Sequence, residues 1–200
     1  MTMIGFIRHG ATEWNAEHRI QGLRDVPLSA EGRTALEGAR PPALLARAHW
    51  YASPLLRAVE TAEMLGLMAM PEPLLLEMDW GEWEGRTVAE LRTADPEGMK
   101  VNETRGLNFR PPGGESPRDV QARIKDWAEA LVDQGPGVYG AVTHKGVIRA
   151  AVALALGWDM LPPDPVKLKW NAAHILRVTT AGAFEVVELN VPFGRMGEIR

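Results

Sequence analysis

The sequence predicts a three-layer helix–sheet–helix α/β fold, with a mostly parallel sheet and an antiparallel edge strand. Two observations predict this class. Short apolar runs typical of buried strands alternate with longer helical patterns, as expected when helices connect parallel strands. Charged or polar residues directly follow several of these runs, and open α/β sheets bind ligands at the carboxyl ends of their strands. At 200 residues, the chain is expected to form a single domain.

The composition excludes several classes of function. The net charge is −4 and there is no basic tail, whereas binding to nucleic acid needs a concentrated cationic surface. The absence of cysteine excludes disulfides and thiolate metal sites. Secretion is not expected, because the N-terminus lacks a basic segment followed by a long apolar core and a cleavage site. The most apolar helical stretch, residues 150–156, is too short to span a bilayer. We therefore expect a cytoplasmic protein without nucleic-acid or membrane partners.

The first predicted strand covers residues 4–7, which are apolar and rich in β-formers. Arg8 and His9 follow at the point where this strand ends. They would deliver a permanent cation and a nucleophile of near-neutral pKa to the ligand-binding edge of the sheet. Gly10 would let the backbone approach a ligand closely. An isolated Arg-His pair is more often incidental, so this motif depends on support from the rest of the chain.

A loop is predicted after the first motif, because residues 16–29 are polar and contain Gly and Pro. Asn15 and Gln21 can donate amide hydrogens to phosphate oxygens, although ordinary loop hydrogen bonding is an alternative for both. His18 is interpreted as a surface residue. Ser29 is expected to cap a helix that runs from Ala30 to the region of residue 40, where two prolines would end it.

The second predicted strand covers residues 49–52, after a short helical piece at residues 43–48. Ser53 and Pro54 then form a typical helix start, in which the serine caps and the proline fits the first turn. Arg57 would lie in that first turn, where a cation is unfavourable but an anion is attracted. A bound phosphate would resolve this conflict. A solvent-facing arginine is the alternative.

Glu77 lies next to three leucines and close to Trp80 and Trp83. Apolar surroundings favour the protonated form of a carboxyl group, which suits a proton donor. The tryptophans are assigned to the core. The neighbouring acids that compete with Glu77 for this role are Asp79, Glu82 and Glu84.

The segment from residue 87 to 112 has the weakest pattern in the chain, and a possible cap is expected around residues 87–115. Residues 88–92 favour a short helix, and Asp95-Pro96 and Glu97-Gly98 are interpreted as turns. A cap over the site is predicted in this segment, with Arg105 and Arg110 within it. A solvated loop is the alternative.

The next helix is predicted to begin at Ser116-Pro117. Its apolar residues recur at spacings of three and four, which gives one buried stripe, formed by Val120, Ile124, Trp127 and Leu131. Glu115 just before it is expected either to support the site or to be satisfied by the helix dipole.

A strand at residues 141–143 leads to His144, and an apolar helix covers residues 147–156 after Gly146. This order of strand, histidine, glycine and helix repeats the logic of the first motif, because a helix N-terminus attracts anions. Arg149 is expected to pair with an acid or to face the rim of the site. Two strand-like runs, at residues 175–179 and 184–189, favour an antiparallel pair, and His174 is interpreted as structural.

Together these motifs resemble, in the same order, those of the histidine phosphatase superfamily, the phosphoglycerate mutase-like proteins. The resemblance covers nearly the whole chain and includes Arg8-His9-Gly10, the block around Arg57, Glu77 and His144. It implies that Asn15, Gln21 and Gly22 occupy positions of the family's phosphate-binding loop. The chain departs from the family at two positions: Ala11 replaces a common acid, and Lys145 replaces the glycine that usually follows the second histidine.

The resemblance also implies a role for each residue. His9 would be the nucleophile, Glu77 the proton donor and then acceptor, and a protonated His144 would stabilise charge on the phosphate. Two arginines, Arg8 and Arg57, would grip the dianion through forked hydrogen bonds. The remaining predicted phosphate ligands are Asn15, Gln21, Gly22 and Lys145. No metal and no cofactor are predicted, since the histidines lack metal-ligand spacing and no dinucleotide- or nucleotide-binding motif is present.

These roles predict that the protein hydrolyses a small phosphorylated metabolite, a phosphomonoester, through a phosphohistidine intermediate. A phosphoglycerate mutase is the alternative, although the chain is short for the classical mutases and lacks an obvious long lid. A non-catalytic phosphate-binding module ranks third, because it would be expected to lose His9, Glu77 or His144. The sequence leaves open which metabolite is the substrate and whether the protein is a monomer or a homodimer.

Overall fold

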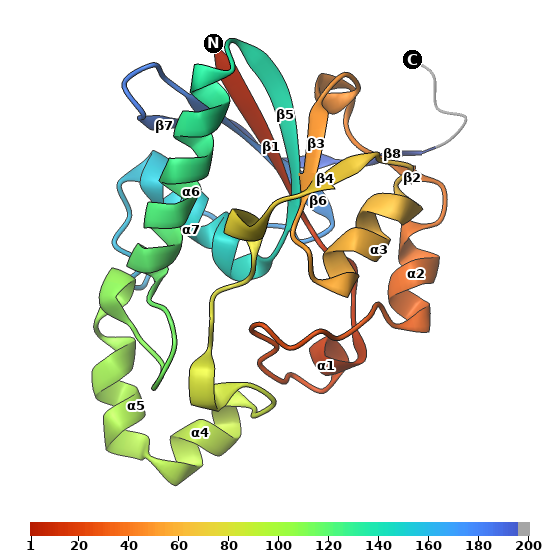
Figure 1. Ribbon diagram of the computed structural model, residues 1–200. Coiled ribbons are helices and arrows are strands. Elements are labelled where there is room, and N and C mark those ends of the chain that lie inside the picture. Colours follow the sequence, from red (N-terminus) through yellow and green to blue (C-terminus); the bar gives the residue numbers. More distant parts are fainter. Residues whose placement is uncertain (196–200) are drawn as a thin grey trace.

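A computed structural model describes residues 1–195 and contains one six-stranded sheet (Figure 1). Its strands follow the order β4-β3-β5-β1-β6-β7. Four neighbouring strands are parallel, β6 is antiparallel to β1, and β7 is antiparallel to β6. The strands are β1 (Thr2–Arg8), β3 (His49–Ala52), β4 (Ala69–Pro71), β5 (Gly137–Thr143), β6 (Ala172–Val178) and β7 (Phe184–Pro192). The predicted fold class is confirmed, and the predicted antiparallel pair is the β6–β7 pair.

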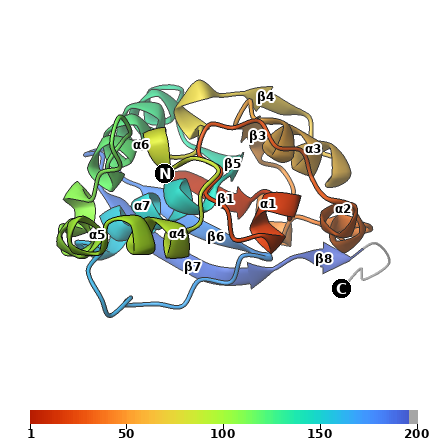
Figure 2. The ribbon, with the colours of Figure 1, turned by 90° about the horizontal axis from the view of Figure 1, so that it is seen from below.

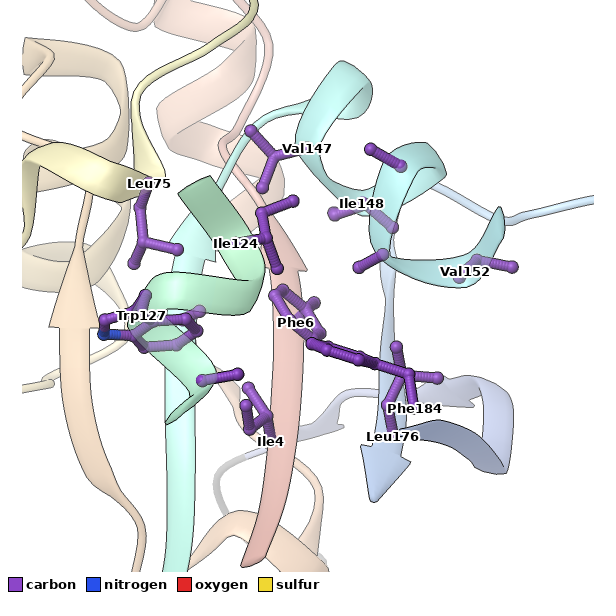
Figure 3. Close-up of a cluster of buried hydrophobic side chains, with 14 of the residues drawn as sticks. Ile4, Phe6, Leu75, Ile124, Trp127, Val147, Ile148, Val152, Leu176 and Phe184 are labelled. Carbon is purple, nitrogen blue, oxygen red and sulfur yellow. The ribbon is translucent and has the colours of Figure 1, made fainter. Parts of the chain in front are cut away.

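Helices cover both faces of this sheet (Figure 2). On one face lie α6 (Pro117–Asp133) and α7 (Lys145–Leu156), and on the other lie α2 (Ala30–Leu36) and α3 (Leu56–Met64). Side chains of a strand point alternately to the two faces, so Ile4 and Phe6 pack toward α6 and α7 (Figure 3). Ile7 packs in the core on the opposite face. The predicted stripe of α6 is buried in the first of these cores. Burial on both faces fixes the register of β1 and therefore the place where Arg8 and His9 emerge.

Three predicted helix boundaries are wrong. The helix after Ser29 ends at Leu36, and Gly38 takes a positive φ of 68° before Ala39–Arg40 (β2) pairs with Gly194–Arg195 (β8). The helix after Ser53 begins only at Leu56, and its N-cap receives no side-chain hydrogen bond. The expected turns at residues 95–98 instead open a helix, α5 (Pro96–Glu103), because the Asp95 side chain accepts a hydrogen bond from the Gly98 N–H.

The segment that was predicted as a cap folds into α4 (Val88–Ala94), α5 and a 3₁₀ turn at Gly106–Asn108. The two helices lie beyond the end of the sheet, on the same side as α1 (Glu13–Ala16) (Figure 1). A small apolar cluster of Ile20, Leu91 and Met99 ties this segment to the first loop. The other short elements are 3₁₀ turns at Ala43–Leu45, Pro73–Leu75 and Gly81–Trp83. None of the helices in residues 1–195 is long and apolar enough to cross a membrane.

Candidate active site

The predicted site residues meet at the carboxyl ends of β1, β3 and β5. The His9 N–H donates to the Thr143 carbonyl at 2.9 Å, which joins the loops that follow β1 and β5. A cavity of about 680 Å³ opens there, and eight of the nine predicted residues line it: Arg8, His9, Asn15, Gln21, Gly22, Arg57, Glu77 and Lys145. The ninth, His144, lies beneath it, with its ring centroid 5.1 Å from that of His9.

The side chain of His9 is held in one orientation by the backbone. Its Nδ1 lies 2.7 Å from the Gly10 carbonyl oxygen, which can only accept, so Nδ1 carries the proton. The lone pair of a neutral ring is then on Nε2. Burial lowers the pKa of His9 well below its usual value, and the charges of Arg8 and Arg57 lower it further. The nitrogen that a nucleophile needs is therefore unprotonated near neutral pH.

The ring of His144 is fully buried and both of its nitrogens have partners. Arg57 Nε donates to Nδ1 at 3.3 Å, and Nε2 lies 2.7 Å from Ser53 Oγ. Burial lowers the pKa of His144 well below its usual value, followed by the influence of His9 and Arg57. This arrangement favours a neutral ring, in contrast to the protonated form expected from the sequence. A phosphate dianion beside the ring would favour protonation again.

The two predicted arginines are held in different ways. Arg57 donates to the Gly22 carbonyl at 2.8 Å and to the Arg24 carbonyl at 2.7 Å, so it fixes the loop between Gln21 and Arg24. The Nε of Arg8 is buried without a hydrogen-bond partner among residues 1–195. Its guanidinium lies over the Trp170 ring, 5.6 Å from the centroid. Arg8 therefore keeps its donors for a ligand in the cavity.

The loop residues have local roles that orient them. The Oδ1 of Asn15 accepts hydrogen bonds from the Thr12 N–H and hydroxyl, which leaves the Nδ2 donors free for the cavity. Gly22 has a positive φ of 53°, and a Cβ there would lie 1.9 Å from Glu84 Oε1. Glu84 accepts from the Leu23 N–H at 2.7 Å, so it supports the loop from below. Gln21 is buried, and its Oε1 has no partner within the described residues.

Glu77 also lines the cavity, and its carboxylate is held by backbone N–H groups. Its Oε1 accepts from the Met78 N–H at 2.9 Å and from the Gly146 N–H at 3.1 Å. A Cβ on Gly146 would lie 2.4 Å from this oxygen, so the close approach depends on glycine. Glu77 is the only one of the four candidate acids that lines the cavity with His9 in the part of the chain described.

The segment that carries Glu77 is braced by Arg123 and Glu115. Arg123 donates to the Leu74 carbonyl at 2.6 Å and to the Glu77 carbonyl at 3.2 Å. Glu115 accepts from Arg123 Nε at 3.1 Å and from the Asp79 N–H at 3.0 Å. Glu115 therefore supports the site, which is one of the two roles expected for it.

Sequence reasoning missed several residues of this site. Ser53 contacts His144 instead of capping a helix, and Trp170 lines the cavity although it stands in a stretch without a recognisable motif. The assignment of Trp80 to the core is incomplete, because Trp80 packs on the core and also lines the cavity. His18 is exposed, as expected of a surface residue, and it also lines the cavity. The position of Ser53 directly after a strand, as with His9 and His144, was the available signal.

Arg149 has one of the two roles expected for it, because it pairs with Asp164 at 2.7 Å. Across residues 1–195, no three His, Asp or Glu side chains are grouped so as to hold a metal ion. The groups in the cavity can bind a dianion, offer a nucleophilic nitrogen and transfer a proton through a carboxyl group.

Known proteins share this sequence pattern and fold. A protein named probable phosphoglycerate mutase GpmB from Cronobacter sakazakii is 34% identical, over 78% of this chain and 76% of its own. The glucosyl-3-phosphoglycerate phosphatase of Mycobacterium tuberculosis is 36% identical, over 75% of this chain and 73% of its own. A solved structure of the mycobacterial glucosyl-3-phosphoglycerate phosphatase with VO3 superimposes with a TM-score of 0.77 at 26% identity, covering 94% of this chain and 98% of the other.

The family model described as the histidine phosphatase superfamily (branch 1) matches residues 4–192. This range contains every residue of the cavity described above. The resemblance predicted from the motifs is thereby confirmed, and the chain belongs to branch 1 of the histidine phosphatase superfamily.

Proposed function

We propose that the protein hydrolyses a small phosphomonoester in two steps, with His9 as the phosphoryl acceptor. One observation carries this proposal: His9 Nδ1 is bound to the Gly10 carbonyl, so Nε2 is the free, unprotonated nitrogen in a cavity that two arginines line. Phosphoryl transfer needs mainly positioning and stabilisation of charge, and this arrangement provides both.

In the first step, Arg8 and Arg57 bind the phosphate dianion on either side of His9. The Nε2 lone pair attacks phosphorus, and the bond from phosphorus to the alcohol oxygen breaks. Protonated Glu77 gives its proton to the leaving oxygen and becomes a carboxylate. Asn15 Nδ2 and the Gln21 amide are placed to donate to the equatorial phosphate oxygens.

In the second step, water attacks phosphorus and the bond from phosphorus to His9 Nε2 breaks. The Glu77 carboxylate accepts a proton from this water, so the carboxyl group returns to its starting form and inorganic phosphate leaves. His144 gains a proton more readily while the dianion is bound, which would stabilise the charge on its oxygens. Ser53 and Arg57 hold the neutral ring in place, and a proton gained on Nδ1 would replace the hydrogen bond from Arg57.

A mutase is a second candidate, because one relative carries that name and α4 and α5 lie beyond the site. A mutase transfers the phosphoryl group from His9 to an alcohol and must exclude water. We favour hydrolysis because polar residues that are at least partly exposed, including His18 and Arg19, line the cavity, so water can reach it. A single domain with a cap at residues 87–115, a cytoplasmic location and a homodimer remain predictions from the sequence.

The test is hydrolysis of p-nitrophenyl phosphate with excess chelator, combined with rapid acid or base quenching to trap a phosphoprotein. His9→Ala is compared with His49→Ala, because His49 is an exposed residue of β3 outside the described cavities. We expect phosphate release and an acid-labile, base-stable phosphoprotein that are lost only in His9→Ala.

Other outcomes separate the candidates. A stable phosphoprotein without release, together with rapid interconversion of phosphoglycerates, would favour the mutase. Binding of inorganic phosphate without turnover of any phosphomonoester would favour the non-catalytic module.

A further inference from the structure

We propose that the alcohol part of the substrate combines an apolar body with an anionic group, and that it binds in a second cavity next to Glu77. This inference rests on the proposed function, because it uses Glu77 as the proton donor. The second cavity measures about 330 Å³ and shares Glu77, Trp80 and Lys145 with the phosphate cavity. Since Glu77 protonates the leaving oxygen, the alcohol must begin beside this carboxyl group and can continue into the second cavity.

The side chains around this second cavity are mainly apolar. Met78, Trp80, Phe109 and Met160 line it, with the Trp80 and Phe109 ring centroids 5.7 Å apart. A small polar alcohol such as glycerate would leave these surfaces without a partner. An aromatic or branched aliphatic body would bury them, and the free energy gained is proportional to the apolar area removed from water.

The local backbone holds Met160 in the cavity in a conformation that is unfavourable by itself. Met160 has a positive φ of 63°, which costs energy for a non-glycine residue and is found where surrounding structure enforces it. Two hydrogen bonds enforce it here. Trp158 Nε1 donates to the Leu161 carbonyl at 2.8 Å, and the Leu161 N–H donates to Asp159 Oδ1 at 3.0 Å.

Two cations line the second cavity, Arg149 and Lys145, and within residues 1–195 only Arg149 has an ion pair. Arg149 pairs with Asp164, and Glu103 pairs with Arg92, both at 2.7 Å. Glu77 accepts hydrogen bonds from two backbone N–H groups, and the proposed function uses it as the proton donor. Lys145 makes no hydrogen bond or ion pair within residues 1–195. Lys145 is exposed in the absence of a ligand, and a ligand that fills the apolar cavity beside it would shield the ammonium group from water and so favour an anion on that ligand.

Lys145 and Arg8 both lie near the Trp170 ring, and both line the phosphate cavity. Each lies 5.6 Å from the Trp170 centroid. Arg8 and Arg57 already supply two guanidinium groups for the transferred phosphate, so Lys145 is available for a different anion. The sequence predicts instead that Lys145 binds the transferred phosphate. In that case Lys145→Met would reduce turnover of every ester equally in the experiment below.

The experiment compares three phosphate esters of primary alcohols. 4-Carboxybenzyl phosphate has both the ring and the anion, 4-carbamoylbenzyl phosphate has the ring alone, and the phosphate ester of 4-hydroxybutanoate has the anion alone. We expect the first to have the highest kcat/KM, by about tenfold or more over each of the others. The affinity of the three esters for His9→Ala, measured by calorimetry, gives the same comparison without turnover.

Two variants assign the effects to residues. Lys145→Met should reduce kcat/KM for the carboxybenzyl ester about tenfold more than for the carbamoylbenzyl ester. Lys125→Met removes the same charge from an exposed position of α6 and should not change this ratio. Met160→Gln keeps the side-chain length but adds a polar group to the apolar lining, so it should reduce the advantage of both ring-bearing esters over the butanoate ester.

Two results would overturn the inference. If Lys145→Met reduces turnover of all three esters equally, the lysine binds the transferred phosphate. If the butanoate ester is preferred in both turnover and binding, the second cavity does not receive an apolar body. Either result leaves the hydrolase intact when p-nitrophenyl phosphate is still turned over. Loss of all turnover would contradict the hydrolase, and the calorimetric comparison would then decide on the second cavity alone.

Discussion

Ser53 Oγ lies 2.7 Å from Nε2 of His144, and both residues are completely buried. Because Arg57 donates to Nδ1, the other nitrogen must carry the proton, and the serine oxygen accepts it. Ser53→Ala would leave this N–H without a partner in the interior, at a cost of about 1–3 kcal/mol. We expect turnover to fall roughly tenfold, because the ring loses its fixed orientation.

The matched control for this prediction is Ser29→Ala. Ser29 is also buried, but its hydroxyl caps α2 by accepting from the Gly32 N–H. Loss of this cap should cost about 1 kcal/mol of stability and leave turnover near that of the wild type. Thermal unfolding and kcat/KM are measured for both variants. Equal effects of the two serines on turnover would mean that Ser53 acts only through stability.

Gly146→Ala is expected to displace the Glu77 carboxylate, because the new Cβ would lie 2.4 Å from Oε1. Alanine is otherwise favourable in a helix, so the loss should appear in kcat before it appears in stability. We expect kcat to fall about tenfold or more. In a Glu77→Gln background, the same substitution should have little further effect on kcat. Additive losses in the double variant would contradict this explanation.

Arg8 and Arg57 are predicted to differ in their effects on stability. Arg57→Lys would lose the fork that binds the Gly22 and Arg24 carbonyls, and hydrogen bonds from charged groups contribute about 1.5–3 kcal/mol each. Arg8 Nε has no protein partner in residues 1–195, so Arg8→Gln should keep the melting temperature or raise it. Both variants should lose phosphate release about a hundredfold or more. A lower melting temperature for Arg8→Gln than for Arg57→Lys would refute this division.

The pH dependence of stability follows from the lowered pKa of His9. The unfolded histidine has a pKa of about 6.5, so between this value and the lower folded pKa the unfolded state binds more protons. Stability should therefore fall as the pH drops below about 6.5, by up to about 1.4 kcal/mol per pH unit for this group. Above that range the contribution does not change. Urea unfolding at pH 8, 6 and 5 should show that the wild type loses more stability than His9→Gln, whereas parallel losses would contradict the lowered pKa.

The parts of the site that could be predicted from the sequence are those at the ends of strands. Arg8, His9 and His144 follow apolar runs directly, and period-two burial in a sheet places such residues at one edge. Glu77 could be proposed because of its motif, but its neighbours in sequence do not show what holds it. Its support comes from Gly146 and Arg123, which lie 69 and 46 positions away.

The missed features depend on contacts between distant segments. Ser53-Pro54 is a typical helix start by local propensity, but the hydroxyl contacts His144, and this tertiary contact outweighs capping. The Asp95-Pro96 pair is equally compatible with a turn and with a capped helix start. In the structure it begins α5, and Met99 of this helix packs on Leu91 and Ile20, which are distant from it in the sequence or belong to another helix. Trp170 has no local pattern, because its role comes from the two cations that lie over its ring.

The pairing of β1 with β5 also has a consequence for how the protein is made. Both neighbours of β1 come late in the chain: β5 places Thr143 beside Arg8, and β6 follows at residues 172–178. The protein is synthesised from its N-terminus, and β5 begins only at residue 137 of 200. Both edges of the apolar strand at residues 2–8 therefore stay unpaired until more than two thirds of the polypeptide has emerged. We expect nascent chains stopped before residue 137 to depend on chaperones and to lack affinity for phosphate. Phosphate binding by a nascent chain would therefore report that β1 has paired with its late neighbours in the sheet.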